Sequence, residues 1–221
     1  METQDSTTVT TAFNRIYNES SWGDEDGTKS GGGSTHSVNR TRNLFLAFSI
    51  LRLNVKEIYD ICGDCNWQRD FMKLLPDRQY FGVDASSVAL EKAIDRLLPN
   101  MQVSVKACDM VKNCPPIKNP KQSLFIVKEV IQHLPLNMGV SLLKNIKNAG
   151  VRFIAITHHD PKLHEGVANN NVEPGGFYPN NIFIEPFNFK NPIFDVSDFI
   201  ADDKKRTMGN LLIFDLQQQN I

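Results

Sequence analysis

Acidic side chains recur where short apolar runs of this 221-residue chain come to an end. One lies in the turn Cys62-Gly63-Asp64-Cys65-Asn66-Trp67, and Asp84 closes the next run, 21 residues after the glycine of that turn. Asp109 follows the third run, and Lys128-Glu129 follows the fourth. If the runs are neighbouring parallel strands, these residues meet at one edge of the sheet, where open α/β sheets bind ligands.

The chemistry of this edge suits a nucleoside cofactor. Backbone N–H groups of the turn 62–66 precede a helix and can hold a carboxylate or a phosphate. Asp84 is placed to accept two ribose hydroxyl groups. Asp109 is placed to accept an adenine amine beside the apolar Met110. A ribose, an adenine and a small anionic end along one sheet edge predict S-adenosylmethionine as the cofactor.

Other readings of the same residues stay open. Both aspartates are also common as helix caps and turn residues. NAD is disfavoured because no G-x-G-x-x-G follows the first strand, and the chain has no P-loop. The pair Cys62-x-x-Cys65 admits a thioredoxin-like redox role. Cys108 and Cys114 are spaced wrongly for a paired zinc knuckle, so we expect no metal site.

Strand-like and helix-like segments alternate through residues 55–160, which predicts βαβ units and a mostly parallel sheet. The expected strands are 55–61, 80–83, 103–107, 123–128, 151–157 and 211–216, and the expected helices are 38–53, 67–75, 86–98 and 136–149. We interpret residues 55–160 as a Rossmann core. Residues 161–221 are expected to form a loop on the substrate side and the last strands.

The N-terminal part is expected to cover this core. The polar, Thr-rich residues 1–12 predict a disordered tail, and residues 13–54 a lid followed by a helix. The apolar face of that helix is expected to comprise Leu44, Phe45, Phe48, Ile50 and Leu51. The segment from Trp22 to Ser34, with three consecutive glycines, reads either as a lid over the cofactor or as a flexible linker.

Composition limits the partners. Lys+Arg 24 against Asp+Glu 25 gives a net charge of -1, so a nucleic-acid partner is open but not indicated by charge. Four cysteines are ordinary for a reducing compartment. No secretory signal is visible, and the apolar runs are too short to span a membrane. We therefore expect a soluble cytoplasmic protein without a membrane partner.

Several short motifs follow one another in a specific order. They are Ile16-Tyr17-Asn18, Trp22-Gly23, Ser30-Gly31-Gly32-Gly33-Ser34, Thr41, Cys62-Gly63-Asp64, Asn66-Trp67, Gly82-Val83-Asp84, Lys128-Glu129, His133-Leu134, Thr157-His158, Gly176-Phe177-Tyr178 and Pro186-Phe187-Asn188-Phe189. Over residues 13–216 this order resembles the small class I S-adenosylmethionine-dependent methyltransferases, most of them uncharacterised bacterial proteins. The resemblance implies an α/β, Rossmann-like domain with about seven mostly parallel strands and an N-terminal lid segment.

The resemblance also implies a reaction, transfer of the methyl group to an oxygen or nitrogen nucleophile of an unknown small or macromolecular acceptor. The first strand departs from the family pattern, since Tyr59 stands where the pattern has Asp and Asp60 follows it. A degenerate module that binds the cofactor or a partner is therefore one alternative. A nucleic-acid 2′-O-methyltransferase is another, although its Lys-Asp-Lys-Glu set is not visible as such.

The candidate site combines these lines of reasoning. Glu129, His133 and His158 are the expected catalytic residues, because a positioned base can assist methyl transfer. For both histidines, an ordinary structural role is the competing interpretation. Ser34 or Thr41 is expected to bond the methionine carboxylate. The expected cofactor-binding residues are Trp22, Ser34, Thr41, Cys62, Gly63, Asp64, Asn66, Trp67, Asp84, Asp109, Met110 and Lys128.

Overall fold

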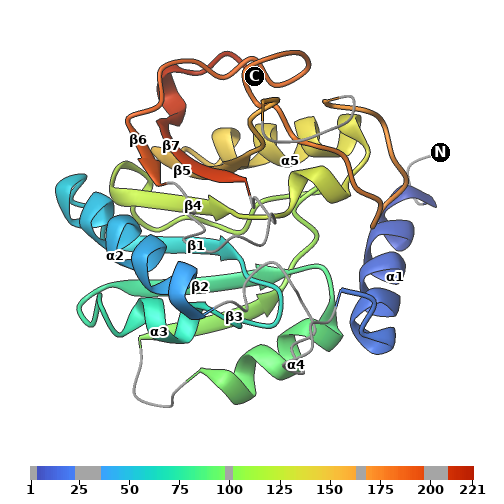
Figure 1. The fold of residues 1–221 in the computed structure, drawn as a ribbon. Helices are drawn as coiled ribbons and strands as arrows, with labels where there is room; N and C mark the ends of the chain where they lie inside the picture. The colour runs from blue at the N-terminus through green and yellow to red at the C-terminus, as the bar shows by residue number, and fades with distance from the viewer. Residues whose placement is uncertain (1–3, 23–35, 98–101, 163–167, 197–208) are drawn as a thin grey trace.

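The computed structural model describes residues 4–22, 36–97, 102–162, 168–196 and 209–221. Their centre is a seven-stranded sheet in the order β3-β2-β1-β4-β5-β7-β6 (Figure 1). Its strands are β1 (Glu57–Ile61), β2 (Gln79–Asp84), β3 (Val103–Ala107), β4 (Ser123–Val127), β5 (Phe153–His158), β6 (Phe194–Val196) and β7 (Asn210–Asp215). Strands β1 to β5 pair in parallel, and β7 runs antiparallel to both β5 and β6.

The helices are α1 (Gln4–Glu19), α2 (His36–Arg52), α3 (Gln68–Met72), α4 (Ser87–Arg96) and α5 (Leu136–Asn148), with short 3₁₀ turns at Pro120–Gln122, Ile131–His133 and Leu216–Gln218. Each expected strand and each of the four expected helices is present, with ends within a few residues of the prediction. Ser86 caps α4, since its hydroxyl accepts a hydrogen bond from the backbone N–H of Ala89 (3.2 Å). None of the helices in the described ranges is long and apolar enough to cross a membrane.

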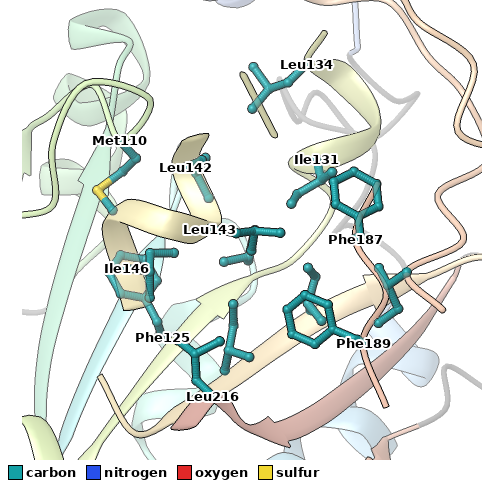
Figure 2. Packing of buried hydrophobic residues seen from close by; sticks show 14 of the residues in the cluster. Met110, Phe125, Ile131, Leu134, Leu142, Leu143, Ile146, Phe187, Phe189 and Leu216 are labelled. Atoms are coloured by element: carbon teal, nitrogen blue, oxygen red, sulfur yellow. The ribbon is translucent and has the colours of Figure 1, made fainter. Parts of the chain in front are cut away.

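The sheet separates two apolar cores, which explains why its central strands are apolar on both faces. One core joins alternate strand residues such as Phe125 to α5 and to Phe187 and Phe189 of the loop 168–192 (Figure 2). The other joins the intervening residues, such as Ile126, to α2, α3 and α4. All five residues of β4 are buried, because both faces of the sheet are covered. The sheet is therefore the middle layer of a three-layer arrangement.

The N-terminus differs from its prediction, because the disorder expected of residues 1–12 does not hold for residues 4–12. These residues belong to α1, which lies beyond the carboxyl ends of the parallel strands in Figure 1. Val9, Ile16 and Tyr17 are buried on this helix. Their spacing, with Phe13 between them, gives one apolar face that packs on the domain. Tertiary packing therefore outweighs the weak helix propensity of the threonines.

Helix α2 also differs from expectation, in the face that it buries. Leu44, Phe45, Phe48 and Leu51 are 52–55% exposed, and only Ile50 of the expected apolar face is buried. Because α2 is apolar on both sides, periodicity alone does not determine its rotation. Arg42 determines it, since this fully buried guanidinium lies 4.8 Å from the centre of the Trp67 ring.

The core around α5 supplies a test of stability. Phe187 is fully buried against α5, where a Cβ atom at Gly139 would lie 3.5 Å from its ring. We expect Phe187→Ala to lower the free energy of unfolding by about 3–5 kcal/mol in urea titrations, because it leaves a cavity. Phe48→Ala, at a side chain that is 55% exposed, is the matched control and is expected to cost less than about 1 kcal/mol. Equal losses would contradict the described core.

Candidate active site

The turn after β1 is fastened to the end of β2 by one carboxylate. Asp84 accepts hydrogen bonds from the backbone N–H of Gly63 (3.1 Å) and from that of Ser86 (2.8 Å). Gly63 has a φ of +53°, a left-handed conformation that favours glycine. Burial raises the pKa of Asp84 to about 6, although these N–H donors oppose the shift. Asp84 thus joins the turn, β2 and the start of α4.

The other residues of the turn mostly hold it in place. Asp64 is buried and pairs with Arg96 of α4, whose guanidinium lies 2.7 Å from its carboxylate. Trp67 packs between Arg42 and the Phe71 ring, 5.4 Å away. Asn66 is partly exposed and lines a polar cavity of about 360 Å³ with Arg69, Asp70, Lys73 and Arg96. The part of the turn that can contact a ligand is therefore mainly the backbone around Gly63 and not these side chains.

The two cysteines of the turn are buried free thiols. A hydrogen bond with Cys65 and burial both raise the pKa of the Cys62 thiol. A reactive cysteine of the thioredoxin type needs the opposite, a thiolate stabilised by its surroundings. The geometry therefore favours a packing role for this pair over the redox alternative.

Asp109 at the end of β3 has one oxygen to offer. Its Oδ1 accepts a hydrogen bond from the backbone N–H of Val111 (3.1 Å), so the residue does shape its own turn. Its Oδ2 is buried and has no hydrogen-bond partner in the described part of the chain. Met110, by contrast, is buried in the core beside α5 (Figure 2). An orphaned acceptor of this kind fits an amine of a ligand.

Helix α1 covers the turn at Gly63. A Cβ atom on Gly63 would lie 2.5 Å from the hydroxyl of the buried Tyr17. Burial, with the negative charges of Asp84 and Asp64, raises the pKa of this phenol well above its ordinary value. Asn14 fastens the same helix to the end of β2, where its Oδ1 accepts a hydrogen bond from the Ser86 hydroxyl (2.8 Å). The sequence prediction missed Tyr17 and Asn14 as site residues.

A second group of side chains follows β4. Glu129 has a φ of +53°, and its N–H donates to the Thr157 hydroxyl on β5 (2.8 Å). One carboxylate oxygen accepts from Gln132 (2.6 Å), whereas Oε1 is buried and has no hydrogen-bond partner within the described ranges. Lys128 is buried, and its charge opposes the burial that raises the pKa of Asp60 to about 6.

His133 is held as a neutral imidazole with a defined tautomer. Burial lowers its pKa, so the ring is uncharged at neutral pH. Its Nδ1 lies 2.7 Å from the carbonyl oxygen of Gly176. Because a carbonyl oxygen only accepts, Nδ1 must carry the proton, and Nε2 keeps a lone pair. Trp22 lies over this ring with the two centres 4.4 Å apart, so the structure brings an expected cofactor-binding residue to a candidate base.

The loop 168–192 brings aromatic rings to His133. Gly175 and Tyr178 donate backbone hydrogen bonds to the 3₁₀ turn at Ile131–His133, over 2.8 and 3.2 Å. The half-exposed Phe177 ring then lies 5.9 Å from His133 and 5.7 Å from His159. The sequence prediction chose His158, whose ring instead meets Phe183 edge to face at 4.8 Å. The sequence prediction missed His159, whose ring lies near the same Phe177 ring as that of His133.

His159 has the opposite tautomer to His133. Its Nδ1 accepts a hydrogen bond from the backbone N–H of Asn180 (3.0 Å), so Nε2 carries the proton of the ring. One expected residue, Thr41, stands apart from this group. Thr41 is exposed on the outer face of α2, on the same side as Leu44. Ser34 lies outside the described residues.

The comparisons with known proteins concern the architecture around this site. No protein-family model matches the sequence, and no curated protein matches it. Solved structures do match. Magnesium protoporphyrin IX methyltransferase (ChlM) from Synechocystis PCC 6803, with S-adenosylhomocysteine bound, is 13% identical with a TM-score of 0.60, over 95% of this chain and 98% of that one. The fold is that of the class I methyltransferases.

Two further structures agree with this fold. The methyltransferase domain of bacterial CtHen1 is 22% identical with a TM-score of 0.54, over 81% of this chain and all of that one. Mitomycin 7-O-methyltransferase MmcR is 11% identical with a TM-score of 0.55, over 81% of this chain and 54% of that one. At these identities the likeness concerns the fold, and function has to be argued from the site.

The raised pKa of Asp84 makes stability depend on pH. The folded protein keeps a proton up to a pH of about 6, whereas the unfolded chain loses it near 3.8. The free energy of unfolding should therefore fall as the pH rises from about 4 to 6, by about 3 kcal/mol for such a shift, and then level off. Asp60 has a similarly raised pKa and adds a second contribution in the same window.

Asp84→Asn is expected to remove roughly half of this pH dependence, because an amide does not titrate. Urea denaturation measured at several pH values would show a shallower slope between pH 4 and 6. Asp77→Asn, at an exposed position, is the matched control and should keep the slope of the wild type. An unchanged slope in Asp84→Asn would contradict the described burial of Asp84.

Proposed function

We propose that the protein is an S-adenosylmethionine-dependent methyltransferase that acts on an oxygen or nitrogen nucleophile. One observation carries the proposal: at adjoining strand ends Asp84 fastens the Gly63 turn, and Asp109 leaves a buried oxygen that has no hydrogen-bond partner among the described residues. These groups match the three polar parts of the cofactor, its ribose, its adenine amine and its methionine end. Free cysteines agree with a cytoplasmic location.

Each group has a separate task toward the cofactor. Asp84 would accept from the ribose hydroxyls, and Asp109 Oδ2 from the adenine amine. The backbone of the Gly63 turn would hold the methionine end beside the Tyr17 hydroxyl, which packs so closely on Gly63 that it leaves no room for a side chain there. When bound, the cofactor supplies an electrophilic methyl group, and no metal is needed for its transfer to a positioned nucleophile.

The residues beyond β4 would handle the acceptor. The lone pair on His133 Nε2 can take the proton of an attacking O–H or N–H group, and the lowered pKa keeps that lone pair free at neutral pH. Glu129 Oε1 is a second acceptor for the same proton or for another donor of the substrate. Phe177 lies beside His133 and His159 and is more than half exposed, so it offers an apolar surface to the acceptor.

The first strand favours one alternative, a module that binds the cofactor or a partner without turnover. Tyr59 takes the place of the family's acidic residue and stacks on Phe81, with ring centres 4.8 Å apart. Its hydroxyl donates to Glu57 (3.0 Å), so the side chain is committed to the interior. Asp60, one position further on, accepts buried hydrogen bonds from Gln68 and Tyr80 at its Oδ2.

Calorimetric titration of S-adenosylmethionine and S-adenosylhomocysteine tests the cofactor site. We expect the wild type to bind both ligands and Asp84→Ala to bind at least about tenfold more weakly, because buried hydrogen bonds to the ribose are lost. Asp77→Ala, at an exposed aspartate, is the control and should bind like the wild type. No heat from either ligand, with the protein folded by circular dichroism, would refute the proposal.

The catalytic role of His133 is tested by turnover. With a panel of phenol, amine and carboxylate acceptors, the release of S-adenosylhomocysteine identifies an acceptor. His133→Gln is then expected to lower kcat by about 10²–10⁴-fold. It should also remove the fall in rate at acidic pH, because that fall reports protonation of the imidazole. The affinity for S-adenosylmethionine should stay unchanged. Cofactor binding without turnover of any acceptor would instead support the non-catalytic module.

A further inference from the structure

The outer face of α2 has an unusual composition. Its exposed described residues are Arg40, Thr41, Leu44, Phe45, Phe48, Leu51 and Arg52. The four large apolar side chains, which we call the apolar stripe, are each more than half exposed. At about 100° per residue the stripe spans about 120° of the helix surface. An arginine stands at each end of this face, and no acidic residue occurs anywhere in α2.

The rest of the fold keeps the stripe outward. Leu46 and Ile50, on the opposite face of α2, are fully buried in the core. Arg42, on the same buried face, stacks on Trp67 at the end of the turn 62–67. Rotating the helix to hide the stripe would remove all three side chains from these contacts. A helix that is apolar all round is normally covered on both sides, so the stripe is a contact surface.

The charges indicate what this surface contacts. In antiparallel pairing of two copies, Arg40 of one helix would face Arg52 of the other, with no acidic residue on the face to compensate. A negatively charged lipid surface complements both arginines at once. Leucine and phenylalanine on one side, flanked by arginine, are typical of helices that lie in the membrane interface.

We propose that the outer face of α2 docks the protein on the surface of an anionic membrane. The stripe would enter the boundary between headgroups and acyl chains, with the helix lying parallel to the membrane. Arg40 and Arg52 would contact lipid phosphates at its two ends. The whole chain has a net charge of -1, so attraction to anionic lipid must come from local groups such as these. The expectation of no membrane partner rested on apolar runs too short to span a bilayer, which docking on a membrane surface does not require.

Vesicle flotation of the full-length protein tests the proposal. The vesicles contain phosphatidylcholine alone, or phosphatidylcholine with phosphatidylserine as the minor lipid. We expect binding to the phosphatidylserine vesicles, at least about tenfold weaker without phosphatidylserine or in high salt. The double variant Phe45→Ser/Phe48→Ser should lose this binding, because it removes the two rings of the stripe. Circular dichroism and S-adenosylmethionine titration check that this variant is folded.

Ile94→Ser is the matched control, since Ile94 on α4 is 60% exposed and lies outside the stripe. It should float like the wild type. The proposal is overturned if the wild type binds vesicles with phosphatidylserine no better than vesicles without it. It is also overturned if Phe45→Ser/Phe48→Ser binds these vesicles as strongly as Ile94→Ser does. Sedimentation that shows a dimer dissociated by the double variant, without vesicle binding, would assign the stripe to a second copy and also overturn it.

Discussion

The hydrogen bonds of one buried carboxylate organise the end of the sheet. Asp84 accepts from Gly63 and Ser86, and so fixes the turn after β1 against the start of α4. Burying a carboxylate is unfavourable unless donors surround it, and its raised pKa shows that two N–H groups compensate only partly. A ribose would supply further donors. The residue that shapes the turn is therefore also the one that gains most from a bound nucleoside.

The core and the strand-end acids were predictable because both follow from local sequence pattern. Runs that are apolar on both faces, such as 123–127, indicate buried parallel strands, and turns at their carboxyl ends must lie at one edge. The contact of Trp22 with His133 was not predicted from the sequence. Its position over His133 depends on α1, whose apolar spacing at Val9, Phe13 and Ile16 was a signal present in the sequence.

Other features were not predictable because they depend on contacts between distant segments. His159 and Phe177 meet only because the loop 168–192 forms backbone hydrogen bonds with the turn Ile131–His133. Phe177 belongs to one of the ordered sequence motifs, but no sequence pattern pairs it with His159. The rotation of α2 likewise depends on Arg42, because a buried arginine over Trp67 contradicts the expectation that charged residues face solvent.

Arg42 connects the two surfaces of the molecule that carry proposals. On its inner side α2 must present Arg42, Leu46 and Ile50 to the core beside the turn 62–67, which leaves no choice of rotation. The outer side is free of that constraint, and an ordinary surface helix would carry charged residues there. Leucine and phenylalanine in those positions instead leave more than half of each side chain exposed. The packing of the domain does not explain these residues. Docking on an anionic membrane explains them, because acyl chains lie there directly beside negatively charged headgroups.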